Sequence, residues 1–188
     1  MDTILASATV TGTRLAETLR ATHGWNLTAS EAFLLVYGGS VSFMKMGVAC
    51  DSGCWGRSTG RNSIEVYTNI VDDGGVNRLI GDEHWAVHEL GHSFVNATGG
   101  SLPLTHYENL QRVGYADRGG RCLSEYCGFA GDQWEWQRSG DGATSEEFAD
   151  MFLGWVYSQW ESGTINGYQR SLFMNHMMPT YVDMTVNR

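Results

Sequence analysis

The chain has 188 residues, enough for one domain with a buried core, and no linker-like segment divides it. Its formal net charge of −9 argues against nucleic acid or an anionic membrane as a partner. No apolar run has membrane-spanning length, and the first residues do not resemble a signal peptide. We therefore expect either a cytosolic protein or a mature chain whose leader has been removed.

Two helices are expected near the beginning of the chain. Residues 12–23 place apolar side chains on one side, and Gly24 is a typical C-terminal stop. Thr28 and Glu31 have the spacing of a capping box, which predicts a short apolar helix over residues 32–37.

One strand is predicted with a clear signal. Residues 63–70 alternate between apolar or threonine side chains and polar ones, which is typical of a half-buried strand. Residues 41–46 are mixed and could form another strand. The intervening residues 47–61 are rich in Gly and Ser, so we expect a loop there.

The four cysteines lie in two close pairs, Cys50 with Cys54 and Cys122 with Cys127. An even number of cysteines is typical of a secreted, disulfide-bonded protein, and four cysteines allow three pairings. A structural zinc site is an alternative, but its usual Cys-x-x-Cys spacing is present in neither pair. Free thiols in a cytosolic protein are a third interpretation. We favour two disulfides and a secreted or otherwise extracytoplasmic location.

The central motif is HExxH, formed by His88, Glu89 and His92 on a helix expected over about residues 81–96. Residues four apart share one face of an α-helix, so both histidine rings can reach one metal ion. Glu89 follows directly and can reach a water molecule on that ion. Zinc lowers the pKa of such a water towards 7, so a carboxylate can accept its proton. The motif therefore predicts zinc peptidase chemistry.

A chance occurrence of this pattern is the alternative to a metal site. Trp85, Leu90 and Phe94 are apolar, so we expect the helix to be buried. A single histidine on such a helix is usually a satisfied core residue. Two histidines with a glutamate between them are costly to bury without a metal ion, which favours the metal site.

The sequence His-Glu-Leu-Gly-His resembles the active helix of the zincin metallopeptidases. The resemblance implies that His88 and His92 bind zinc and that Glu89 is the general base. It also implies an α+β fold, in which a small twisted sheet packs on the HExxH helix and a mainly helical C-terminal lobe follows. The whole chain would be one domain, with its cleft between about residues 1–100 and 101–188. In zincins a strand just before the active helix forms the edge of the cleft, and the strand over residues 63–70 stands in that place.

A catalytic zinc site usually has three protein ligands and one open position. In one zincin group the third ligand is the last histidine of HExxHxxGxxH. This chain has Val95 and Thr98 where that motif has its glycine and third histidine, so the group is excluded.

A second amphipathic helix is expected from about residue 144, after an irregular insertion over residues 101–143. Thr144 and Glu147 have capping-box spacing, which leaves Glu146 as the freer carboxylate. Glu146-x-x-x-Asp150 resembles the third-ligand helix of the gluzincins, the thermolysin-like and related families. The resemblance implies that Glu146 binds zinc and that Asp150 accepts a hydrogen bond from a ligand histidine and fixes its tautomer.

Other assignments stay open. Both acids could simply be solvated residues at a helix start, where the helix dipole favours them. The third ligand could also be Glu147, His106, Glu108 or Asp117.

Two further roles are expected near the motif. His84 shares the face of His88, but we expect it beside the site or at the surface rather than on the metal. A hydrogen-bond donor is also needed for the oxyanion of the tetrahedral intermediate. Related zincins use a Tyr, His or Arg from the C-terminal part, and we choose Tyr168 over Arg170 and His176.

We therefore expect a zinc metallopeptidase with Zn²⁺ as cofactor, acting on a peptide or protein substrate as an endopeptidase rather than an exopeptidase. We expect a monomer, with no nucleic-acid or membrane partner. One alternative is a zinc amide hydrolase acting on a non-protein amide, similar to deformylases; their Cys-Leu-Ser precedes HExxH, whereas residues 122–124 follow it here. The other is a catalytically silent zincin-fold binding module, against which the intact Glu89 argues.

Overall fold

The computed structural model describes residues 2–50, 54, 56–67, 83–100, 103–106, 144–160 and 165–187. In chain order its elements are α1 (Asp2–His23), α2 (Ala29–Tyr37), β1 (Ser42–Lys45), β2 (Gly56–Gly60), β3 (Ser63–Val66), α5 (Glu83–Ala97), α8 (Thr144–Tyr157) and α9 (Ile165–Val186). The described chain is a mostly helical α+β structure with one small open sheet of three strands, so the predicted α+β class is confirmed at that level.

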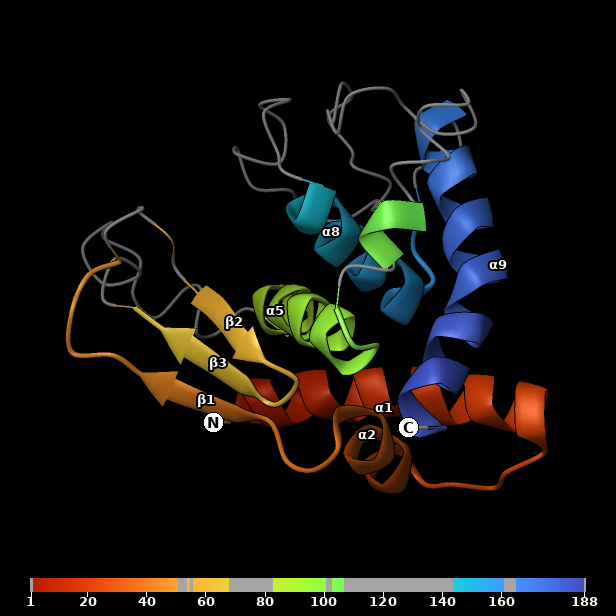
Figure 1. Ribbon diagram of the computed structural model, residues 1–188, viewed down its shortest axis with the longest axis horizontal. Coiled ribbons are helices and arrows are strands. Elements are labelled where there is room, and N and C mark those ends of the chain that lie inside the picture. Colours follow the sequence, from red (N-terminus) through yellow and green to blue (C-terminus); the bar gives the residue numbers. More distant parts are fainter. Residues whose placement is uncertain are drawn as a thin grey trace.

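Helix α5, which carries the HExxH motif, lies between α1 and α8, with the sheet beside it (Figure 1). Its side chains Val87, Leu90 and Phe94 are buried in one hydrophobic core with residues of α1, α2, α8 and α9. The hydroxyl of Tyr37 at the end of α2 donates a hydrogen bond of 3.0 Å to the carbonyl oxygen of Leu90. Packing on several elements therefore fixes the position of the motif.

Helix α1 begins at Asp2, whereas the sequence predicted a start near residue 12. The added part is rich in Ser and Thr, which often favour turns because their hydroxyls hydrogen-bond to nearby backbone. Here Ser7 and Thr9 donate to the carbonyls of Thr3 and Leu5 in the preceding turn, at 2.9 and 2.7 Å. These bonds are compatible with a helix, which explains why the segment stays helical.

The capping box predicted at the start of α2 is confirmed. The side chain of Thr28 accepts a hydrogen bond from the Glu31 backbone, and the Glu31 carboxylate accepts one from the Thr28 backbone. The helix ends at Gly38, whose φ of 70° is the left-handed conformation that favours glycine.

The sheet has the strand order β1-β3-β2, with β1 parallel and β2 antiparallel to β3. Ile64 and Val66 are the buried residues of β3 and lie on one face, as the alternation predicted. The predicted strand continued to residue 70, but residues 68–70 lie outside the described stretches.

The loop predicted over residues 47–61 was wrong in its last part, because residues 56–60 form β2. The strand was missed because its sequence, Gly-Arg-Ser-Thr-Gly, has no apolar side chain and so no alternation. Pairing with β3 and packing on α5 hold it in place instead.

Arg61, in the turn between β2 and β3, ties the sheet to two helices. Its guanidinium donates to the carbonyl of Val36 near the end of α2, at 2.7 Å from the terminal nitrogen and 3.1 Å from Nε. It also donates to the carbonyl of Thr185 near the end of α9, at 3.2 Å. The carbonyls at a helix end lack partners within the helix, so one cation satisfies both ends.

A disulfide joins Cys50 and Cys54 just before β2, and it is compatible with an extracytoplasmic location. The predicted pair of Cys122 and Cys127 lies outside the described residues, as does the insertion predicted over residues 101–143 except for residues 103–106. Within the described stretches, no helix has the length and apolar character needed to span a membrane.

Candidate metal centre

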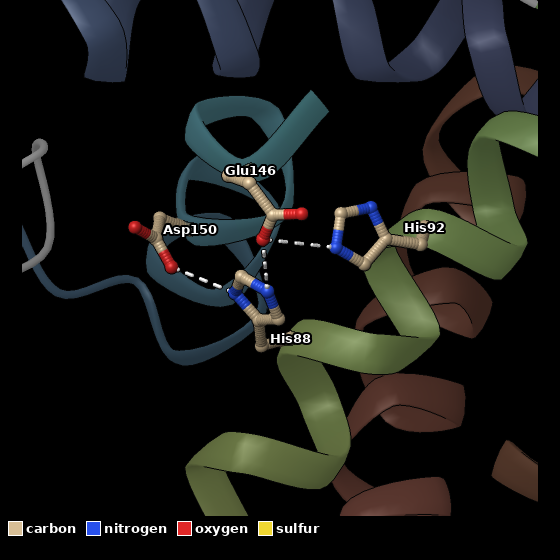
Figure 2. Close-up of polar contacts among 4 residues, drawn as sticks. All are labelled: His88, His92, Glu146 and Asp150. Carbon is tan, nitrogen blue, oxygen red and sulfur yellow. Dashed lines mark hydrogen bonds and ion pairs between the residues drawn. The ribbon is translucent and has the colours of Figure 1, made fainter. Parts of the chain in front are cut away.

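Three side chains from two helices converge in a group that could hold a metal ion (Figure 2). His88 and His92 project from successive turns of α5, and Glu146 comes from the first turn of α8. Oε2 of Glu146 lies 3.2 Å from Nε2 of His88 and 3.3 Å from Nε2 of His92. The three candidate ligand atoms all lie within 4.8 Å of one another.

These distances can be compared with those of a tetrahedral zinc site. Zinc bonds of about 2.0–2.1 Å to nitrogen and oxygen place two neighbouring ligands roughly 3.3 Å apart. Glu146 already has this separation from both rings, and two imidazoles with one carboxylate are a common donor set for catalytic zinc. The donor set and the two separations from Glu146 therefore fit a metal ion such as zinc.

Asp150 orients one of the two rings. Its Oδ1 lies 2.7 Å from Nδ1 of His88, and both side chains are almost completely buried. With the Nδ1 proton directed at Asp150, Nε2 is the nitrogen that faces Glu146 (Figure 2). Such a partner fixes the ring and raises its basicity as a ligand.

The carboxylates control the charge of the group. Burial alone would lower the pKa of His88, but the hydrogen bonds to Asp150 and Glu146 outweigh it and raise this pKa to about 10. Burial alone would raise the pKa of Glu146, but the hydrogen bonds from His88 and His92 hold it well below its usual range. At neutral pH the metal-free site is thus an ion pair of His88 and Glu146. A divalent cation can replace the proton of His88.

Glu89 lies beside this group in a different environment. It is 5% exposed, and its Oε2 has no hydrogen-bond partner among the described residues. Burial raises the pKa of its carboxyl group, against the opposing charges of His92 and His88. A buried carboxyl oxygen without a partner is costly, and such groups cluster at functional sites. It is an acceptor that a bound water could use.

A pocket of about 400 Å³ borders His92 and Glu146. Its other walls come from β2, the second half of α5, the segment over residues 103–106 and the start of α8. Lining residues from these walls are Gly56, Ser58, Val95, Asn96, Leu104 and Ser145. The pocket is thus bounded by residues from both parts between which the cleft was expected.

The strand beside this pocket is β2, not the strand predicted for that place. β3 is the central strand of the described sheet and is paired on both sides, so its backbone cannot bind a further strand. β2 pairs with β3 on one side only, and no other strand of the described sheet pairs with it. The expected edge role was therefore wrong for residues 63–66, residues 68–70 lie outside the description, and the edge strand of the described sheet beside the pocket is formed by residues 56–60.

Side chains that the sequence did not single out attach β2 to α5. The hydroxyls of Ser58 and Ser93 lie 2.9 Å apart. The Asn96 side-chain amide donates to Ser58 Oγ at 3.1 Å and to the Gly60 carbonyl at 3.3 Å. A lone Ser or Asn on a helix carries little signal in a single sequence, so these contacts were not predictable.

The alternative ligands have other partners or lie outside the description. Glu147 is buried and accepts hydrogen bonds from Nε and a terminal nitrogen of Arg170, the former at 2.9 Å. Nδ1 of His106 lies 3.1 Å from the hydroxyl of Tyr181. Glu108 and Asp117 lie outside the described residues.

None of the remaining candidates is among the described residues that line the pocket. The ring of His84 meets that of Tyr157 edge to face, with centroids 5.0 Å apart. Tyr168 is half exposed on α9 and is not among the described residues that line the pocket. Its role as oxyanion donor remains a prediction. Arg170 is held in the core by Glu147, and His176 is exposed.

Comparison of the chain with protein-family models, with curated proteins and with solved structures gives no match, so its function has to be inferred from the site itself.

Proposed function

We propose that the protein is a zinc-dependent metallopeptidase with a site of the gluzincin type. The observation that carries the proposal is the position of Glu146, which lies at zinc-ligand spacing from both histidines of the HExxH motif although 58 residues separate it from His88. Asp150 on His88 and the buried Glu89 beside the group add two further parts of such a site.

The mechanism follows from the residues around the group. His88, His92 and Glu146 would hold the zinc ion, which when bound lowers the pKa of a coordinated water towards 7 and polarises the substrate carbonyl. Glu89 then acts as general base, accepting a proton from the water and passing it to the leaving amine. Glu89 suits this role because its buried Oε2 has no hydrogen-bond partner among the described residues and can accept from the water.

Substrate orientation is attributed to β2. The edge of β2 away from β3 is paired with no other described strand, and its backbone N–H and C=O groups lie beside the pocket, where an extended peptide can add as a further strand. This mode of binding uses only the peptide backbone, so it favours an endopeptidase that accepts an internal stretch of chain.

The proposal is tested by comparing the wild type with Glu89→Gln. Both proteins are expected to bind one zinc ion per chain by elemental analysis, because Glu89 is not a ligand. Only the wild type is expected to cleave a library of unstructured peptides, with a loss of at least about a hundredfold in the variant.

Two other outcomes separate the alternatives. A zinc-loaded wild type that binds peptides but cleaves none would be a binding module. Cleavage of small acylated amines, with no cleavage of peptides, would identify an amide hydrolase. A chain that takes up no zinc at all would refute each of these zinc-dependent functions.

A further inference from the structure

Two glycines lie close to the residues to which the chemistry is assigned, Gly91 next to His92 in the sequence and Gly56 against Glu89 in space. Gly91 lies in α5 directly before His92, and Gly56 is the first residue of β2. Neither has positive φ, so the backbone conformation at both positions is open to any residue. The glycines are therefore explained by the lack of space for a side chain at these two positions.

At Gly91 the space is occupied by α8. A Cβ atom added there would lie 2.9 Å from Cα of Ala149, 3.2 Å from its carbonyl oxygen and 3.1 Å from Cβ of Phe152. Two of these atoms belong to the backbone, so only a movement of the helix can relieve the contact. Ala149 lies between Glu146 and Asp150, so this movement would displace both carboxylates from the histidines.

At Gly56 the space is occupied by the carboxylate of Glu89. An added Cβ atom would overlap Oε1 of Glu89 and lie 2.5 Å from its Cδ. It would also lie 3.0 Å from Cζ2 of Trp85, which closes the other side. A side chain at position 56 would therefore force the carboxylate out of its present place.

We propose that Gly91 and Gly56 are positioning residues with separate tasks. Gly91 sets the separation of α5 and α8 at which the three metal ligands meet. Gly56 sets the position of the Glu89 carboxylate and does not affect the positions of the three metal ligands. The first statement rests on the metal-binding group alone, whereas the catalytic meaning of the second rests on the proposed function.

The task of Gly91 is tested with Gly91→Ala. Zinc affinity, measured by competition with a chromophoric chelator, is expected to fall roughly ten- to a hundredfold, the range typical of residues that orient metal ligands. The visible spectrum of the cobalt-loaded protein is expected to change as well, because it reports the geometry of the ligands. Unchanged zinc affinity would overturn the proposal for Gly91.

Gly12→Ala is the matched control. Gly12 lies where α1 meets α2, and an added Cβ atom would overlap the carbonyl oxygen of Ala29. This variant is expected to unfold at a lower temperature yet to bind zinc within about twofold of the wild type, because its contact is remote from the ligands. If circular dichroism shows that Gly91→Ala does not fold, Ala149→Ser is the substitute variant. It adds one atom to the same buried interface from the side of α8. A smaller loss of zinc affinity is then expected, and no loss would overturn the proposal.

The task of Gly56 is tested by a double-mutant cycle with Glu89→Ala. Gly56→Ala is expected to lower the urea midpoint of the wild type and to lower it much less in the Glu89→Ala background, where the overlapping carboxylate is absent. Zinc affinity is expected to stay within about twofold. Equal destabilisation in the two backgrounds would overturn the proposal for Gly56.

Activity is then a separate measurement. If the wild type cleaves peptides, Gly56→Ala is expected to lower kcat at least about tenfold through the displaced base. If the wild type cleaves nothing, the proposed function fails while the cycle still decides whether Gly56 positions Glu89.

Discussion

His88 is the residue on which the charges of the site converge. Its two ring nitrogens face carboxylates from the same helix, Asp150 at Nδ1 and Glu146 at Nε2. A metal ion would compete for the Nε2 lone pair only, so Asp150 stays in place when the metal binds. The two acids of α8 thus have different functions although both contact one ring.

Removal of the charge on Asp150 is expected to weaken zinc binding. In Asp150→Asn the amide no longer favours the tautomer with a proton on Nδ1, so zinc affinity should fall roughly ten- to a hundredfold in a chelator competition. Asp183→Asn is the matched control. Asp183 of α9 forms a second His–Asp pair with His23 of α1, at 2.9 Å, and neither residue belongs to the metal-binding group. A loss of equal size in both variants would contradict the role of Asp150.

Zinc binding near neutral pH is expected to release about one proton, since a metal ligand must be deprotonated. The pKa of about 10 means that His88 is protonated in the metal-free protein at pH 7, whereas Glu146 is already ionised there. Affinity should therefore increase by about tenfold per pH unit until the pH approaches the pKa of His88. Calorimetry in buffers with different ionisation enthalpies measures this proton, and heats that are independent of the buffer would exclude it.

At the scale of the element, the position of α8 decides whether a third ligand is present. A buried ion pair joins α8 to α9, because the side chains of Glu147 and Arg170 are 2% and 0% exposed. Glu147 adjoins Glu146, so this pair holds the turn from which the ligand projects. A buried pair of this kind contributes less to net stability than to the uniqueness of the packing.

Arg170→Met is expected to lower the free energy of unfolding by about 3–5 kcal/mol, because it leaves the buried carboxylate of Glu147 without its cation. The exposed Arg20, which donates to Asn26 at 3.2 Å, provides the control Arg20→Met with an expected change within about 0.5 kcal/mol. Urea denaturation of the metal-free proteins measures both. The double variant Glu147→Leu/Arg170→Met should be more stable than Arg170→Met, and the reverse order would argue against the pair.

The elements differ in how far their sequences predicted them. The helix of the HExxH motif was predictable because its periodicity is local, and the alternation of Ile64 and Val66 marked β3. β2 was not predictable, since its inward positions are Gly56 and Ser58, which are small because Glu89 and Ser93 occupy the space. Because the residue types of β2 are determined by the residues packed against it, its own sequence has no pattern that predicts a strand.

The metal-binding group could likewise be predicted only in part from the sequence. The spacing of His88 and His92 follows from helix geometry, so it could be predicted from the five residues of the motif. That Glu146 approaches them depends on how α8 packs on α5, and single-sequence patterns contain no distances between helices. The capping-box spacing of Thr144 and Glu147 and the resemblance of Glu-x-x-x-Asp to a gluzincin helix suggested Glu146, while no motif pointed to the pairing of Arg170 with Glu147.

At the scale of the whole molecule, the charges of the site make stability depend on pH in the absence of metal. His88 has a raised pKa, so its contribution is complete below the unfolded value of 6.5 and is lost as pH rises towards about 10. Glu146 has a lowered pKa, so its contribution is complete above the unfolded value of 4.5 and is lost at lower pH. These two groups together favour the folded state most between about pH 4.5 and 6.5.

The midpoint of thermal unfolding is therefore expected to fall from pH 6.5 to pH 9 in the metal-free protein, and the fall should be smaller in His88→Gln. Saturating zinc is expected to reduce or reverse the trend, because the ion replaces the proton. An identical pH profile for the metal-free wild type and His88→Gln would show that other groups control stability.

The arrangement of the metal-binding group also has a consequence for the stage of synthesis at which the protein could bind a metal ion. A ribosome releases α5 before α8, so a growing chain first presents only the two histidines. Two ligands hold zinc far less firmly than three, and the raised pKa of His88 arises only when the carboxylates of α8 have docked. Until α8 has been made and has packed on α5, the growing chain thus lacks the third member of the group. Metal binding by the complete group would therefore depend on the docking of α8 on α5, a late step of folding.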